Sequence, residues 1–318
     1  MMTPGKTTSG LRLGLGDLVG AGGRAVSRYT GTLFTVFVVQ SLIAAACMIA
    51  VAALLAKTFG NLPMFDDAVD GDLVALVSSI RYADTSFVAI AGIVFGTLVV
   101  WELVTWFLAG GIYGVLAHRP ETRGETARVF GASGVATYLA YARLALCSLI
   151  GWMIVVTVFV VFWSKAVAPR LEHALSLGEL ALPLVLALVP TAVLLHFFWT
   201  VTDYARAELT LRHETHSPGA LATYIRTLIY VARRPLTLIH GGFGWFLVIL
   251  VTLAYALIAH GHPMFGAEGA ITLFVVRQCV ALLRLAIRMG VMGGQLELAR
   301  TRPHPPRRVE TSSEPTAA

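Results

Sequence analysis

The chain has 318 residues, of which 57% are hydrophobic and only 13% are charged, and its mean hydropathy is +0.75. This composition excludes an ordinary soluble protein, a disordered or collagen-like chain and a disulfide scaffold, and it indicates an all-α polytopic membrane protein. The net charge of +6 comes from basic residues scattered between apolar blocks, so we expect membrane lipids, and no nucleic acid, as partners.

Residues 1–30 precede the first apolar block and are predicted to be a cytoplasmic segment with an interfacial amphipathic helix from Gly16 to Tyr29. The block that follows contains Ala44-Ala45-Ala46-Cys47, which faintly resembles a lipoprotein cleavage site. The segment before it is too long for a normal signal peptide, and the apolar run continues to Ala56. We therefore predict that this block is an uncleaved first span.

Apolar runs long enough to cross a bilayer, which takes about 20 residues, predict six transmembrane helices within residues 31–290. The expected spans are 31–57, 87–117, 142–163, 181–202, 241–260 and 269–290. Segments of mixed polarity, Glu125 to Tyr141 and Ala220 to Arg234, precede the third and fifth spans and are predicted to be further interfacial helices on the cytoplasmic side. Residues 291–318 are expected to form a basic, disordered cytoplasmic tail.

The distribution of basic residues predicts the orientation. An even number of spans places both termini on one side, and that side carries sixteen Lys and Arg residues against three in the intervening loops. The positive-inside rule then predicts that both termini are cytoplasmic.

Polar residues inside the predicted spans are candidates for a functional site, because an unpaired charge at membrane depth costs several kcal/mol. The candidate intramembrane polar cluster comprises Glu102, Arg277, Arg284, Arg288, Asp203, Arg206, His196 and Gln40. The three arginines of the last span are separated by seven and four residues, which places them on one helical face. Depths estimated from a rise of about 1.5 Å per residue predict a Glu102–Arg284 ion pair, and a second cluster of Asp203, Arg206 and Arg288.

Two interpretations of these charges remain open. Charged pairs can fix which helices meet and in which register, without contributing much net stability. Alternatively, the arginine stripe lines a hydrated path for an anionic group such as a lipid phosphate, with Glu102 as a gating partner.

Motifs for catalysis, cofactors or metals are incomplete in this sequence. Gly5-Lys6-Thr7 lacks the first glycine of a phosphate-binding loop, and His213-Glu214-Thr215-His216 is one residue too short for a zinc-protease helix. We therefore predict no catalytic, cofactor-binding or metal-binding residue, and no cofactor.

Two short motifs carry a family resemblance. The run Phe107-Leu108-Ala109-Gly110-Gly111 and the run Asp203-Tyr204-Ala205-Arg206 resemble those of a group of six-span bacterial inner-membrane proteins. That group is loosely similar to the membrane domain attached to some glycerophosphodiester phosphodiesterases. The resemblance implies a six-span fold, an expected location in the cytoplasmic (inner) membrane of a bacterium, and no established activity.

These observations favour a non-enzymatic membrane component that packs with lipid, with a partner protein or with further copies of itself. The alternative is a small transporter or permease subunit for an anionic or lipid-like solute. Solvent access to Arg284 separates the two hypotheses, since a scaffold would keep this side chain dry and paired, whereas a transporter would expose it.

Overall fold

The computed structural model describes residues 13–59, 84–171, 177–212, 219–261 and 267–301, and these contain helices and no strand. The helices are α1 (Leu15–Arg28), α2 (Thr30–Phe59), α5 (Asp84–His118), α6 (Arg123–Phe162), α7 (Ala168–Leu171), α8 (Leu177–Arg212), α9 (Ala220–Arg233), α10 (Pro235–Gly261) and α11 (Ala267–Arg300). One π-helical turn, Trp163–Val167, joins α6 to α7. The fold class is therefore all-α, as predicted.

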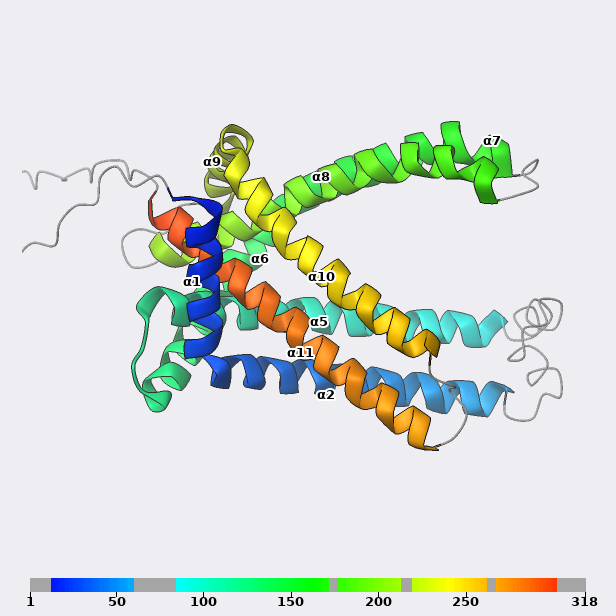
Figure 1. Cartoon of the computed structure of the whole chain (residues 1–318), viewed down its shortest axis with the longest axis horizontal. Coiled ribbons are helices and arrows are strands. Elements are labelled where there is room, and N and C mark those ends of the chain that lie inside the picture. Colours follow the sequence, from blue (N-terminus) through cyan, green and yellow to red (C-terminus); the bar gives the residue numbers. More distant parts are fainter. Residues whose placement is uncertain (1–12, 60–83, 172–176, 213–218, 262–266, 302–318) are drawn as a thin grey trace, which may run out of the picture.

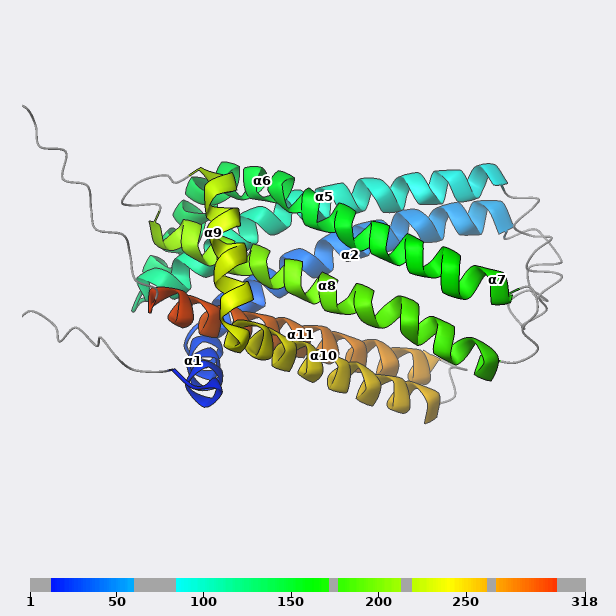
Figure 2. The same ribbon diagram turned by 90° about the horizontal axis from the view of Figure 1, so that it is seen from above.

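Six long helices run lengthwise through the molecule: α2, α5, α6, α8, α10 and α11 (Figure 1). Two shorter helices lie across one end. α1 lies across the long axis in Figure 1 and packs against α11. α9 lies across the long axis in Figure 2 and packs against α8 and α6. The chain thus enters α1 and leaves α11 at the same end of the bundle.

Five of the described helices are long and apolar enough to cross a membrane. Their candidate spans are Thr30–Lys57, Val88–His118, Arg123–Arg170, Glu179–Arg212 and Pro235–His260. These helices are compatible with a multi-pass membrane protein. α11 occupies the sixth expected span but is not among the five, and it carries three arginines within the predicted range.

Three boundaries differ from the sequence expectation. The segment expected to form a separate interfacial helix before the third span is the first part of one continuous helix, α6. α8 continues ten residues beyond its expected span, to Arg212. The predicted start of the C-terminal tail at residue 291 is wrong, because α11 stays helical to Arg300 and buries Gln295, Leu296 and Leu298. Residues 302–318 of that tail lie outside the described residues.

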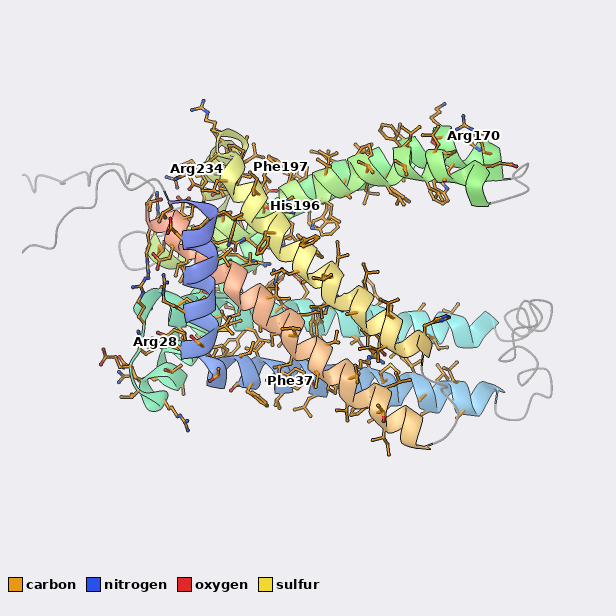
Figure 3. The ribbon with its side chains drawn as sticks, in the orientation of Figure 1. Arg28, Phe37, Arg170, His196, Phe197 and Arg234 are labelled. Carbon is orange, nitrogen blue, oxygen red and sulfur yellow. The ribbon has the colours of Figure 1, made fainter. Side chains whose placement is uncertain are left out.

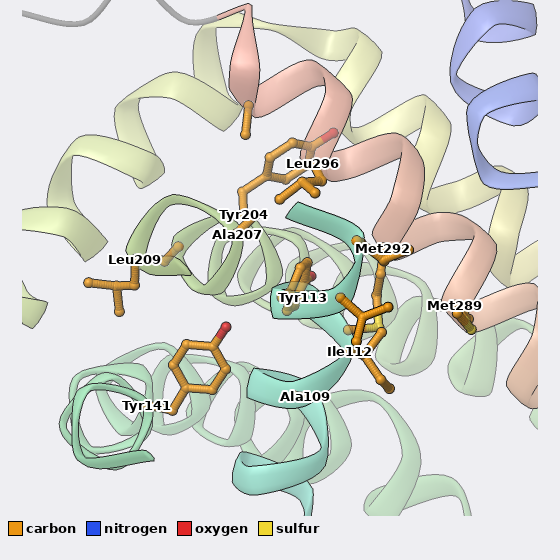
Figure 4. Close-up of a cluster of buried hydrophobic side chains, with 14 of the residues drawn as sticks. Ala109, Ile112, Tyr113, Tyr141, Tyr204, Ala207, Leu209, Met289, Met292 and Leu296 are labelled. Atoms are coloured by element: carbon orange, nitrogen blue, oxygen red, sulfur yellow. The ribbon is translucent and has the colours of Figure 1, made fainter. Parts of the chain in front are cut away.

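The most densely packed core lies near the end that α1 and α9 cross. Tyr113, Tyr141, Tyr204, Met289 and Leu296 are almost wholly buried there (Figure 4). Along the rest of the long helices, by contrast, many large apolar side chains are exposed. Such extensive apolar exposure is the pattern of helices that contact lipid and not water.

Glycines permit close helix packing at two contacts. A Cβ atom on Gly110 of α5 would collide with Thr137 of α6, and one on Gly22 of α1 would collide with the backbone of Gly290 in α11. The Gly110-Gly111 pair therefore serves packing within the chain, as expected for small residues in membrane helices. At Gly92 and Gly96 of the same helix, by contrast, an added Cβ atom would meet open space.

The C-terminus of α5 is tied to the end of α11. Arg119 follows α5 in the left-handed region (φ 53°), a conformation that commonly ends helices. Arg300 donates to the carbonyl oxygens of Leu116 and Ala117, at 3.3 and 2.7 Å, and forms an ion pair with Glu297. A cation bound to the last carbonyls of a helix is also favoured by the helix dipole. These contacts explain why α11 stays ordered beyond its expected end.

Candidate functional site

Asp203 of α8 is the centre of a charged cluster that joins α8 to α11. Its side chain is 6% exposed. Arg288 of α11 donates from Nη2 to Oδ1 across 3.3 Å, and Trp199 donates from Nε1 to Oδ2 across 3.1 Å. Nη1 of Arg206 lies 3.6 Å from the same Oδ1. The predicted cluster of Asp203, Arg206 and Arg288 is confirmed.

Aromatic side chains surround this cluster. The guanidinium of Arg288 lies 4.9 Å from the ring centroid of Trp199, and that ring in turn meets Trp245 of α10 edge to face. The Tyr113 hydroxyl of α5 lies 3.2 Å from the Asp203 carbonyl oxygen and 2.9 Å from Oε1 of Gln295. α5 is thus joined to both α8 and α11 at this level.

Arg206 is buried, yet its guanidinium makes no hydrogen bond within the described part of the chain. Its side chain is 11% exposed, and Nε is buried without a partner. The two charged contacts, to Asp203 at 3.6 Å and to Glu102 at 3.9 Å, are both too long for hydrogen bonds. Tyr141 lies with its ring centroid 5.9 Å from the guanidinium. Nε is therefore a buried donor without a partner, and the two Nη groups meet their carboxylates only at ion-pair distance.

Glu102 does not pair with Arg284, so this prediction is wrong. Oε1 of Glu102 accepts a hydrogen bond from Trp106 at 2.8 Å and lies nearest to the cation of Arg206. Equal depth along two helices does not place two side chains on facing sides. Arg284 is exposed and forms no ion pair in the described residues.

Arg277 and Arg284 lie on a side of α11 that we call the arginine face, defined by Arg277, Arg284, Arg288 and Gln295. Arg288 and Gln295 contact α8 and α5, so this face is turned toward those helices. Exposed apolar residues lie on another side of α11, among them Val275 and Leu283. Arg277 and Arg284 are nevertheless exposed, although they continue a face that is turned inward.

The remaining two candidates stand apart from the cluster. His196 of α8 has Nε2 3.0 Å from the carbonyl oxygen of Leu238, and Figure 3 shows it where α8 passes α10. Gln40 is half-buried on α2 and takes part in no hydrogen bond of the cluster. Both therefore have no demonstrated link to the charged centre.

Sequence reasoning missed the tyrosines and Gln295. Tyr113, Tyr141 and Gln295 are almost wholly buried and polar. Tyr141 was expected at the membrane interface, but its hydroxyl bonds to Thr210 and to the Arg206 carbonyl oxygen. Buried polar groups need such partners. The sequence signal for these tyrosines was their position near the helix ends at the level of Asp203.

Comparisons with protein-family models, curated proteins and solved structures gave no match.

Proposed function

We propose that this chain is a non-enzymatic protein of a bacterial cytoplasmic membrane that crosses the bilayer six times, with both termini cytoplasmic. The six lengthwise helices support this topology, and the basic residues Arg28 and Arg234 lie at the end crossed by α1 and α9, opposite Arg170 (Figure 3). α11 is the sixth span in this proposal, since Arg288 pairs with Asp203 of α8 and the exposed apolar residues of α11 lie on another side of the helix.

Cysteine labelling tests this topology. Single cysteines at Arg123 and Arg233 are expected to react with an impermeant thiol reagent only after the cells are permeabilised. A cysteine at Arg170 is the matched control and should react in intact cells. Labelling of Arg123 or Arg233 positions from outside would refute the orientation.

Within the membrane, the geometry best supports a small transporter or permease for an anionic or lipid-like solute. The observation that carries this proposal is Arg284, which is exposed and has no ion pair among the described residues, although it lies on the inward-turned arginine face. A guanidinium at membrane depth requires water, a counter-charge or an anionic ligand. Arg277 extends the same surface by two further turns.

Anion flux into proteoliposomes tests the transport function. We expect the purified chain to catalyse uptake of small phosphate or carboxylate anions, and Arg284→Gln to reduce uptake at least several-fold. Arg233→Gln, which removes an exposed charge on α9, is the matched control and should retain the wild-type rate. Equal uptake by empty liposomes and by liposomes with protein would contradict this function.

The second candidate is a scaffold that packs with lipid, a partner protein or a second copy of the chain. The observation that favours it is the Asp203 centre, in which hydrogen bonds tie α5, α8 and α11 together. A network of this kind can specify helix register without any ligand. If the chain is a scaffold, the Arg284→Gln variant should bind the same partners as the wild type, and neither protein should transport anions.

A further inference from the structure

Arg206 is an unusual buried charge. Nine-tenths of the residue is removed from solvent, yet its Nε is buried without a partner, and within the described residues its Nη atoms lie 3.6 and 3.9 Å from carboxylate oxygens, too far for hydrogen bonds. Leaving a buried charge without hydrogen bonds is costly, and native proteins satisfy such groups with a partner, an ion or a ligand. The position therefore indicates a binding group that the chain does not itself supply.

The two neighbouring carboxylates form ion pairs with Arg206 but accept no hydrogen bond from it. Asp203 is shared, because its Oδ1 already accepts a hydrogen bond from Arg288 while its Oδ2 accepts one from Trp199. Glu102 is half-exposed, is held by Trp106, and lies 3.9 Å away. Two carboxylates thus lie beside two guanidinium groups, one buried and one half-buried. Neither carboxylate is placed to accept two parallel hydrogen bonds from Arg206.

The charge around the site favours an anion. Glu102 and Asp203 balance Arg206 and Arg288, but Arg284 and Arg277 continue along the same face of α11 and have no counter-charge in the described part of the chain. This arrangement gives an excess of positive charge that leads along the helix to the Asp203 centre. The exposed guanidinium groups of Arg277 and Arg284 can attract an oxyanion, and the buried Arg206, whose Nε has no partner, can then hold it.

We infer that Arg206, with Arg288 beside it, binds a phosphate group carried by the solute, and that Glu102 is the carboxylate that this phosphate displaces. The inference rests on the proposed function and names its substrate class. A phosphate offers several oxygens at once, so it can accept two hydrogen bonds from Arg206 and still contact Arg288. Exposure of Glu102 leaves it free to turn away as the phosphate enters.

Binding of inorganic phosphate to the purified full chain in a non-ionic detergent tests the inference by titration calorimetry. Loss of charge-assisted hydrogen bonds predicts that Arg206→Gln weakens binding by roughly 10-fold or more, and Arg206→Lys should weaken it less. Glu102→Gln removes the competing carboxylate and should tighten binding several-fold. Arg233→Gln is the control and should bind as the wild type does.

The opposite effects of the Glu102 and Arg206 variants separate ligand binding from a structural role. If Arg206→Gln does not fold, Glu102→Gln and Arg206→Lys still decide the matter. Unchanged affinity in Glu102→Gln, or wild-type affinity in Arg206→Lys with no loss in Arg206→Gln, would overturn the inference. Phosphate affinity too weak to detect in both the wild type and Glu102→Gln would overturn it as well.

A second arm distinguishes the source of the phosphate. The protein is placed in nanodiscs of phosphatidylglycerol or of an uncharged glycolipid, and phosphate binding is measured in each. A bound lipid headgroup at Arg206 predicts weaker binding of inorganic phosphate in the phosphatidylglycerol discs, whereas a free phosphate-bearing solute predicts equal binding in both. Anion flux that persists in a folded Arg206→Gln variant would reject this site while leaving the proposed transport function intact.

Discussion

Arg288 of α11 donates a hydrogen bond to Oδ1 of Asp203 in α8 across 3.3 Å, and this contact joins residues 85 positions apart in the chain. Removing Asp203 takes the carboxylate away from the half-buried Arg288, and removing Arg288 leaves the buried Asp203 with only the longer ion pair to Arg206. We expect Asp203→Asn and Arg288→Gln to lower the free energy of unfolding singly, and the double variant to recover about 1–3 kcal/mol of the summed loss.

Reversible unfolding in mixed micelles measures this coupling. The matched control is the pair Glu102→Gln and Arg284→Gln, whose side chains form no ion pair with each other. Their effects should add. Additive effects at Asp203 and Arg288, or strong coupling between Glu102 and Arg284, would contradict the arrangement described here.

Tyr113 links three helices through its hydroxyl, so removing that hydroxyl should loosen the cluster. Tyr113→Phe leaves Gln295 and the Asp203 carbonyl oxygen with one partner fewer, and we expect a loss of about 1–3 kcal/mol in unfolding free energy. Tyr138→Phe is the control, since the hydroxyl of this half-buried tyrosine makes no hydrogen bond to another described residue. A similar melting temperature for both variants would argue against a structural role for the Tyr113 hydroxyl.

The contact of α1 with α11 depends on the absence of a side chain at Gly22. Gly22→Ala would drive a methyl group into the backbone of Gly290, and overpacking of this kind costs typically about 1–3 kcal/mol. Gly23→Ala is the matched control, because a Cβ there meets open space and alanine favours the helix. Thermal unfolding should therefore separate the two variants. Equal stability would mean that α1 is not docked as described.

Arg300 should stabilise the end of α5. Arg300→Gln removes two hydrogen bonds to α5 carbonyl groups and the ion pair with Glu297. We expect a loss of about 1–3 kcal/mol, together with faster amide hydrogen exchange near the contact between α5 and α11. Unaltered exchange in this region would show that the interaction contributes nothing.

Much of the fold follows from hydrophobicity alone. All six expected spans coincide with long helices, because an apolar run of about 20 residues has few other stable conformations in a membrane. Helix ends were harder to predict. Glu208 and Thr210 are polar and lie beyond the expected end of their span at residue 202. Packing among the helix ends buries both residues, and α8 continues through them. Tertiary contacts, which no local pattern encodes, set these boundaries.

The charged site was predictable in part. Depth along a helix correctly placed Asp203, Arg206 and Arg288 at one level, since rise per residue is nearly constant. Depth does not specify rotation about the helix axis or tilt between helices. For this reason the predicted Glu102–Arg284 pair failed, and Glu102 lies nearest Arg206 instead.

Thiol accessibility along α11 tests the central claim that the arginine face is hydrated. In a variant without the three native cysteines, single cysteines replace Arg277, Arg284, Val275 and Leu283, the last two being exposed apolar controls on another side of the helix. Impermeant reagents are applied to intact cells and inverted vesicles. We predict reaction at Arg277 and Arg284 positions and protection at Val275 and Leu283, because a thiol facing hydrocarbon neither ionises nor meets the reagent. Uniform protection of all four positions would contradict the account and indicate a dry structural bundle.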